Sequence, residues 1–354
     1  MRIGLQLGYW GATPPEGAGE LVVEAEKAGF DGVFAAESWG SDAFTPLAWW
    51  GASTSRVRLG TSVAQLSARS PAACAMHALT LDHLSGGRCV LGLGVSGPQV
   101  VEGWYGAPFG KPLARTREYV SIVRQVLARE QPVRNDGPHY PLPAAGPGSL
   151  GLGKSLRSIT HPLRADLPIW LGAEGPRNVA QTAEIADGWI AVYFSPRVAP
   201  LYEEWLADGF ARSGARRDRA GFEVAATCPV VVTDDPAAEK AKVKPSLALY
   251  IGGMGATKMN FHADLFRRMG YPEAVEEITA RFRAGRRAEA AAAVPDELVD
   301  DVSIIGDREQ VRAGVRTWRA AGVDTLLVGC RDVAQLRAVA DAVLGAEDES
   351  LPSG

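Results

Sequence analysis

The sequence predicts a single-domain (β/α)8 barrel, and three observations support that fold class. Short apolar runs alternate with amphipathic stretches along most of the 354 residues, a pattern typical of parallel strands joined by helices. The apolar runs contain too few polar residues to have one face in water, which favours a closed barrel or a doubly wound sheet. There are eight such runs, and eight parallel strands favour the barrel.

The predicted strands are short and rich in aliphatic residues. Helix starts lie between them, because Thr45-Pro46, Ser70-Pro71 and Asp235-Pro236 each offer a capping side chain followed by proline at the first helical position. Ala28-Gly29 and Ala321-Gly322 place glycine where the end of a helix favours a positive φ. We expect the eight strands at Ile3–Leu7, Gly32–Ala35, Arg58–Val63, Cys89–Leu93, Pro168–Leu171, Trp189–Val192, Val224–Val232 and Thr325–Val328.

Two segments interrupt the alternation of strands and helices. Residues 131–167, between the fourth and fifth strands, are rich in glycine and proline and have no periodicity. Residues 237–299, after the seventh strand, have the pattern of helices. Loops as long as the first are usually functional or disordered. We expect both insertions at connections that follow strands, where lids and substrate pockets form, within one domain that spans residues 1–354.

Composition narrows the classes of partner. The formal net charge is −4 and there is no run of lysine and arginine, so we expect neither a nucleic-acid partner nor an anionic membrane surface. The chain starts directly in a strand, and no apolar run is long enough to cross a membrane, so we expect a cytoplasmic protein. We also expect a homodimer with a small-molecule substrate. Four cysteines are scattered along the chain (Cys74, Cys89, Cys228 and Cys330), and we expect buried free thiols. The sequence shows no cluster of metal-ligating residues, so we expect no metal.

Two glycine motifs match nucleotide-binding patterns, but their contexts do not fit. Gly148–Ser155 has the letters of a P-loop, yet no buried strand precedes it and Pro162 follows closely, so we interpret it as a flexible loop whose Lys154 could meet an anion. Gly92–Gly97 has the letters of the dinucleotide fingerprint and follows a strand, but three strand–helix units precede it. We expect Gly92, Gly94, Ser96 and Gly97 to let backbone approach a flat ring or its side chain.

The turn after the fifth predicted strand is a candidate anion site. Gly172-Ala173-Glu174-Gly175 leads into Pro176 and Arg177, where a helix is expected to begin. Unpaired N–H groups and the positive end of the helix dipole point outward at such a turn, and Arg177 adds a cation. An ordinary strand-to-helix turn is the alternative interpretation.

The order and spacing of several stretches resemble the luciferase-like family, and closely its coenzyme F420-dependent branch. These stretches are Ala36–Ala43, Leu59–Val63, Val90–Gly94 and Leu171–Arg177 through to Ala186–Trp189. The resemblance covers nearly the whole chain. It implies a barrel that holds its cofactor at the carboxyl ends of the strands, with contacts from Glu37, Ser38, Ser62, Val63 and Gln65. It further implies a cis peptide bond between Ser62 and Val63.

The same resemblance leaves two cofactors to choose between, because both FMN and F420 occur in the family. F420 carries a phosphate and an oligoglutamate tail, which favour cations around the barrel mouth. Six cations are expected in or near loops there, although each could simply be a solvated charge: Arg69, Lys111, Arg115, Lys154, Arg157 and Arg177. The resemblance therefore carries the choice, and we expect F420, with FMN as the alternative.

The expected reaction is hydride transfer, with proton handling by the protein. Family members that oxidise alcohols or sugar phosphates have a histidine where this chain has Ser38, and a glutamate where it has Pro98. A reductase of an activated C=C or C=N bond fits better, because it needs a proton donor rather than a strong base. Glu37, Asp42 and Tyr193 are the candidate donors, since a carboxyl group in a desolvated mouth can hold a proton.

Each assignment at the mouth has a structural alternative. Glu37 could simply be the partner of an N–H group or an arginine. The aromatic side chains of Trp10, Trp39, Trp104 and Tyr105 could wall a substrate pocket, although Trp39 could equally serve packing. Two other functions stay open: an FMN-dependent monooxygenase with a reductase partner, and a non-catalytic flavin-binding relative, which Ser38 in place of histidine would allow.

Overall fold

Nine strands form one parallel sheet that closes on itself. The structure, a computed structural model, describes residues 1–254 and 260–348. The strand order is β3-β2-β1-β11-β8-β7-β6-β5-β4, and a further pairing of β3 with β5 closes the ring. Since β3 and β4 are consecutive pieces of one position in the wall, the barrel is eight-stranded and the predicted fold class is confirmed. The strands are β1 (Arg2–Gln6), β2 (Gly32–Ala35), β3 (Arg58–Thr61), β4 (Ala64–Gln65), β5 (Cys89–Gly94), β6 (Ile169–Gly172), β7 (Gly188–Ala191), β8 (Glu223–Thr227) and β11 (Thr325–Val328).

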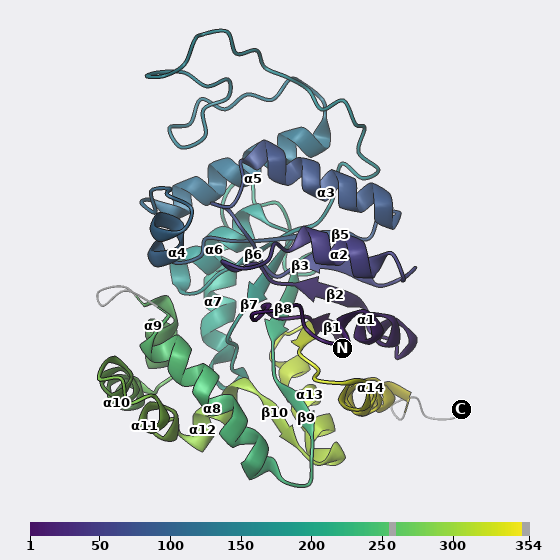
Figure 1. Ribbon diagram of the computed structural model, residues 1–354, viewed down its shortest axis with the longest axis vertical. Coiled ribbons are helices and arrows are strands. Elements are labelled where there is room, and N and C mark those ends of the chain that lie inside the picture. The colour runs from purple at the N-terminus through teal and green to yellow at the C-terminus, as the bar shows by residue number, and fades with distance from the viewer. Residues whose placement is uncertain (255–259, 349–354) are drawn as a thin grey trace.

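Helices surround the barrel, and a second group of helices lies beside it (Figure 1). Those around the wall are α1 (Ala18–Lys27), α2 (Phe44–Gly51), α3 (Pro71–Ser85), α4 (Pro98–Gly103), α5 (Pro112–Ala128), α6 (Pro176–Ile185), the short 3-10 helix η1 (Pro196–Val198), α7 (Ala199–Phe210), α13 (Arg308–Ala320) and α14 (Val333–Asp348). The group beside the barrel comprises α8 (Pro236–Gly252), α9 (Phe261–Arg268), α10 (Pro272–Arg283), α11 (Arg287–Ala292) and α12 (Asp296–Val302). Among the described residues, no helix is both long and apolar enough to cross a membrane.

Two of the three predicted helix starts are confirmed, and the one at Thr45-Pro46 is wrong, because α2 begins at Phe44 with Thr45 already inside it. The Ser70 hydroxyl accepts a hydrogen bond from the Ala73 N–H at 3.3 Å, and Pro71 begins α3. Asp235 does the same for α8, where its carboxylate accepts from the Ala238 N–H at 3.1 Å. Gly29 and Gly322 end their helices at φ values of 89° and 92°, in the left-handed region that glycine adopts without strain.

Large side chains fill the barrel interior. Phe34 and Trp170 stack there with ring centroids 5.7 Å apart, in a cluster with Val90, Ile190, Ala225 and Leu327. A methyl group on Gly60 would overlap the Phe34 ring, so this strand position has room only for glycine. The Arg58 guanidinium lies 5.1 Å from the Trp170 ring centroid and forms two 3.0 Å hydrogen bonds with Glu223. Because the interior is packed, the centre of the barrel has no room for a ligand.

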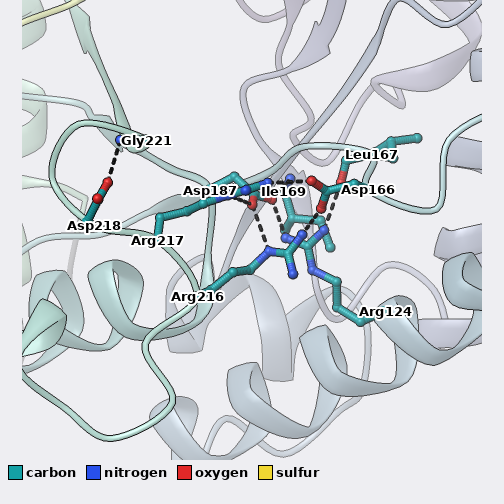
Figure 2. Close-up of polar contacts among 9 residues, drawn as sticks. All are labelled: Arg124, Asp166, Leu167, Ile169, Asp187, Arg216, Arg217, Asp218 and Gly221. Atoms are coloured by element: carbon teal, nitrogen blue, oxygen red, sulfur yellow. Dashed lines mark hydrogen bonds and ion pairs between the residues drawn. The ribbon is translucent and has the colours of Figure 1, made fainter.

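An ion cluster closes the amino-terminal side of β6 and β7 (Figure 2). The Asp187 carboxylate accepts hydrogen bonds from the Ile169 N–H at 2.8 Å, Arg216 Nε at 2.7 Å and Arg217 Nε at 2.9 Å, and it pairs with Arg124 from α5. Burial, together with the neighbouring positive charges of Arg124 and Arg217, lowers the pKa of Arg216 to about 10. These contacts join α5, β6 and the segment that leads into β8, so the cluster stabilises the barrel at the end away from the strand tips.

The predicted seventh strand, Val224–Val232, is wrong in its extent. The chain leaves the barrel after β8, and Val230–Val232 forms β9, which pairs with β10 (Ile304–Gly306) in a separate two-stranded sheet. Pro229 lies at the break, where it has no N–H for a ladder and its carbonyl accepts from the Ile304 N–H at 2.8 Å. Pro229 is therefore the one residue of this run from which the break could have been predicted.

The expected position of residues 131–167 is also wrong. They follow α5 and lead into β6, so they form a helix-to-strand connection rather than one that follows a strand. Arg164, near the end of this loop, pairs with Asp82 and donates to the Cys89 carbonyl at the start of β5. The end of the loop is therefore anchored at the amino-terminal side of the barrel, while its start contacts α5, where the His139 and Tyr140 N–H groups both donate to Glu118 at 3.0 Å. Figure 1 shows the loop extending past α3 and α5. The helical segment that follows β9 does come after a strand, as α8 to α12.

Candidate functional site

The carboxyl ends of the strands bring together most of the residues expected to bind a cofactor. Glu37 follows β2, Gln65 ends β4, Gly94 ends β5, and Gly172 ends β6. The bond between Ser62 and Val63, at the junction of β3 and β4, is cis, as the resemblance implied. Strand ends meet at one face of a parallel barrel, the face on which barrel enzymes carry their active sites.

Val63 lies at the centre of this face and explains two of the glycines. A methyl group on Gly172 would lie 3.1 Å from Val63 Cγ1, and one on Gly94 would overlap Val63 Cγ2. The two glycines therefore make room for the Val63 side chain, not directly for a ligand. Gly92 serves the wall itself, because its N–H donates to Thr61 Oγ1 at 2.9 Å and its carbonyl accepts from the same hydroxyl at 2.6 Å. The approach of Gly92 to a ring stays a prediction.

Glu37 is held as a paired anion. Its carboxylate pairs with Arg69 and accepts a hydrogen bond from the Gln65 N–H at 2.7 Å, while Gln65 Nε2 donates to the Glu37 carbonyl at 2.9 Å. The Glu37 side chain is only 3% exposed. This geometry favours the structural interpretation of Glu37, in which it joins the ends of β2 and β4.

The other candidate proton donors are in two different settings. The Asp42 carboxylate accepts from the N–H groups of Phe44 and Thr45, both at 2.8 Å, and so caps the start of α2. Tyr193 follows β7 and packs against Phe266, with ring centroids 4.8 Å apart. Burial raises the pKa of the Tyr193 phenol well above its ordinary value, so the phenol stays protonated near neutral pH. Ser38 lies next to Glu37 and is half-buried.

An ion pair that the sequence did not predict lies at the same face. His262, on α9, contacts Glu174, which follows β6, with 2.7 Å between Nδ1 and Oε1. Burial alone lowers the pKa of an imidazole, but the charge of Glu174 and this hydrogen bond raise the pKa of His262 above its ordinary value. Tyr250 and Tyr193 lie edge-on to the imidazole, with centroids 4.8 Å and 6.0 Å away. The helical insertion thus places an imidazole, paired with the carboxylate of Glu174, at the strand ends.

Three buried oxygens at the strand ends have no hydrogen-bond partner among the described residues. They are Oε1 of Gln6, Oε1 of Gln65 and Oε2 of Glu174. Gln6 Nε2 is held by the carbonyl and hydroxyl of Ser62, each at 3.3 Å, so its Oε1 is fixed in place. An unpaired buried acceptor costs about 1–3 kcal/mol. The site is therefore suited to a ligand that donates several N–H or O–H hydrogen bonds.

The predicted helix start at Pro176 is confirmed, while the binding of an anion there stays a prediction. Gly175 has a φ of 79°, Pro176 begins the helix, and Arg177 is exposed in the first turn. The N–H groups of a first turn have no carbonyl partner within the helix and meet the positive end of its dipole. Ala173, which precedes this turn, is buried, and its carbonyl accepts from Trp189 Nε1 at 2.9 Å.

Ser96 and Gly97 lie beyond the tip of β5. Ser96 adopts a φ of 59°, and Gly97 precedes α4. Of the four aromatic side chains expected to wall a substrate pocket, two are exposed and two are half-buried. Trp39 and Trp104 are 52% and 63% exposed. Burial raises the pKa of the Tyr105 phenol above its ordinary value. The negative charge of Glu37 raises this pKa further, and the positive charge of Arg69 opposes the change.

Other sequence predictions fall away from this face. Lys154 and Arg157 belong to the loop anchored at the amino-terminal side, and no helix follows Gly148–Ser155. Cys74, Cys89 and Cys228 are buried free thiols as expected, while Cys330 is half-buried. Within residues 1–254 and 260–348, no group of three metal-binding side chains is close enough to hold an ion.

Comparison with known proteins places the chain in a family. The sequence pattern described as luciferase-like monooxygenase matches residues 3–325. The chain belongs to this family. A Mycobacterium tuberculosis protein, provisionally named a coenzyme F420-dependent oxidoreductase, is 65% identical over 97% of this chain and 99% of its own length. The 5,10-methylenetetrahydromethanopterin reductase of Archaeoglobus fulgidus is 28% identical over 86% of each chain.

Solved structures in the family share the fold. The coenzyme F420-dependent tetrahydromethanopterin reductase from Methanopyrus kandleri superposes with a TM-score of 0.80 over 97% of this chain and 98% of its own, at 21% identity. Three residues at the strand-end face were absent from the sequence-based site: Gln6, Tyr250 and His262. Gln6 could have been found as a polar residue that ends an apolar strand. Tyr250 and His262 lie in the helical insertion, where no motif marks them.

Proposed function

We propose that this protein is a coenzyme F420-dependent oxidoreductase that reduces an activated C=C or C=N bond of an organic substrate. The relative that is 65% identical, and whose name refers to F420, supports the cofactor. The observation that carries the direction of the reaction is the Glu174–His262 pair, because a reductase needs a proton donor beside the acceptor bond. Ser38 supports the same direction, since a serine next to Glu37 is not a base for alcohol oxidation.

The residues at the strand ends fit F420. The unpaired oxygens of Gln6, Gln65 and Glu174 suit the ring N–H and the sugar-alcohol hydroxyls of the cofactor. Val63 offers an apolar support at the centre of the face, and the first turn of α6 with Arg177 suits the phosphate. Bound in its reduced form, the cofactor would supply a hydride.

His262 supplies the proton in this proposal. Its imidazolium, held by Glu174 through Nδ1, gives the Nε2 proton to the substrate atom next to the carbon that receives the hydride. The hydride brings two electrons and the imidazole brings the proton, so the reduced bond is balanced, and His262 is then protonated again from water. Its side chain is 20% exposed, which leaves it that access. Tyr193 orients the imidazole through its ring edge.

Direct titration with each cofactor tests the proposal. Reduced and oxidised F420 and FMN are added separately to the purified protein, and the fluorescence of each is followed. We expect saturable quenching with F420 and weak or no quenching with FMN. A panel of enones and cyclic imines should then oxidise bound, reduced F420. Tight FMN binding without F420 binding would overturn the proposal.

The FMN-dependent monooxygenase is the alternative, and it differs in its use of oxygen. Such an enzyme would consume oxygen when given reduced FMN, whereas the reductase would not. A non-catalytic relative would bind F420 and leave the reduced cofactor unoxidised with every unsaturated acceptor tried. These outcomes separate the three functions in one set of measurements.

A further inference from the structure

A groove of about 540 Å3 lies on the outer wall of the barrel, between α5 and α6. These helices flank the paired strands β5 and β6 (Figure 1). The groove begins at Arg177, in the first turn of α6, and its wall includes Leu113, Arg117, Gln181 and Arg212. Arg177 also belongs to the turn assigned to the cofactor phosphate, so the groove and that turn share this residue.

Gln181 gives the groove an unpaired polar atom. Its side chain is 4% exposed, and its Nε2 donates to the Leu113 carbonyl at 2.9 Å. Its Oε1 is buried without a partner among the described residues. Because the Nε2 contact fixes the amide, Oε1 cannot turn toward another group of the protein. This atom is therefore an acceptor open to a donor from outside the chain, and the amide N–H of a peptide-like ligand is one such donor.

The charges of the groove favour an anion. Arg117 forms two hydrogen bonds with Glu184, at 2.7 Å and 2.6 Å, and Arg212 donates to the same carboxylate at 2.9 Å. Arg177 is exposed and has no ion-pair partner in the part of the chain that the structure describes. Arg212 also pairs with Asp208 at 2.8 Å, so with Glu118, which lines the groove, three carboxylates balance three guanidinium groups. Arg177 is the cation of the groove that has no carboxylate partner among the described residues, and a ligand carboxylate would pair with it.

We propose that this groove binds the oligoglutamate tail of F420, a step that rests on the cofactor assignment above. The tail leaves the phosphate at the start of α6 and runs along the groove. A tail amide N–H donates to Gln181 Oε1, and tail carboxylates pair with Arg177 and then with Arg117. Arg177 and Gln181 are one helical turn apart, about 6 Å, which two residues of an extended chain span. A tail with a single glutamate therefore stops short of Arg117.

Binding measurements with different tail lengths test this assignment. Three ligands are titrated by fluorescence: the deazaflavin chromophore without phosphate or tail, F420 with one glutamate, and F420 with a chain of several glutamates. For the unaltered protein we expect the long-tailed form to bind about tenfold more tightly than the one-glutamate form. In Gln181→Leu and Arg117→Gln this difference should disappear, while the affinity for the chromophore alone stays unchanged.

A matched arginine variant controls for the loss of charge. Arg308, at the start of α13, forms an exposed ion pair with Asp341 of α14. Neither residue lines the groove, so Arg308→Gln removes one exposed ion pair and leaves the groove intact. It should keep the full tail-length effect. Melting temperatures show whether Arg117→Gln is folded, and Gln181→Leu removes the unpaired oxygen without altering any ion pair.

The outcomes separate this inference from the cofactor assignment. If the unaltered protein binds every deazaflavin form with the same affinity, the tail site is wrong and F420 remains the cofactor. If the tail-length effect persists in both groove variants, the tail binds elsewhere and the groove assignment is overturned. If no deazaflavin form binds, the cofactor assignment fails first, and the tail site fails with it.

Discussion

At the scale of single residues, the site depends on one pair that lies far apart in the sequence. Glu174 and His262 are 88 positions apart and meet at 2.7 Å. Sequence patterns identified Glu174 through its turn, but His262 lies in a helical segment with no motif around it. Glu37, by contrast, was predicted from the sequence as a site residue. In the structure Arg69 and the Gln65 N–H hold its carboxylate as a structural anion.

The protonation of His262 should appear in the stability of the protein. Its pKa is raised in the folded state, so the stability that the charged pair contributes is complete below the unfolded pKa, about 6.5, and is lost as pH rises through the folded value. The melting temperature of His262→Gln should therefore fall below that of the unaltered protein at pH 6, and the gap should narrow as pH rises.

A surface histidine provides the control for that experiment. His83 lies on α3, where Nε2 contacts the His161 carbonyl at 2.8 Å, away from the strand ends. The melting temperature of His83→Gln, measured over the same pH range, gives the effect of losing an exposed imidazole that is not part of the Glu174 pair. A gap for His262→Gln that stays constant from pH 6 to pH 9 would contradict a titrating imidazole at this position. In the reductase assay, His262→Gln should lower kcat by about a hundredfold.

At the scale of elements, the strands were the most predictable part of the chain. Seven of the expected strands lie within a residue or two of their place in the barrel, because each is a short apolar run bounded by turn residues. The exception, Val224–Val232, shows the limit of that pattern. Pro229 divides the run into β8 and β9, and the partner that pairs with β9 is β10, more than seventy positions later in the chain.

The packing of β2 against β3 predicts a strong effect of one methyl group. In Gly60→Ala the new Cβ would overlap the Phe34 ring, and that ring cannot move freely because it stacks on Trp170. Overpacking of this kind costs about 1–3 kcal/mol, so the midpoint of urea unfolding should fall. Gly110→Ala is the control, since no heavy atom lies within 4 Å of its added Cβ. Equal midpoints for the two variants would contradict the tight interior.

At the scale of the whole molecule, the two insertions have different places relative to the barrel. The helices α8 to α12 reach the strand-end face through Tyr250 and His262, whereas residues 131–167 join α5 to β6 and anchor at the opposite side. The side chains of Leu150 and Leu152 in that loop are 86% and 78% exposed. The homodimer stays a prediction, and these exposed side chains are where we would look first for a contact between subunits.

The placement of the long loop predicts that cofactor binding survives its removal. The two stems stay close, since the Val133 N–H donates to the Leu156 carbonyl at 2.8 Å and the Asn135 N–H donates to the Leu142 carbonyl at 3.0 Å. Residues 143–155 can therefore be replaced by a short glycine-serine linker. The dissociation constant for F420 should change by less than about twofold, because the loop is not at the strand ends. Loss of F420 binding in this variant would show that the loop does reach the site.

The sequence by itself determined the barrel, the helix caps and the turn at Gly172–Arg177. Each of these depends on residues close together in the chain: apolar runs, a capping side chain before proline, a glycine before a helix start. The tertiary structure alone decided which end of the barrel each insertion covers, that Glu37 is a paired anion, and that His262 meets Glu174. Those outcomes depend on contacts between distant segments, and a contact between distant segments leaves no local pattern in a single sequence.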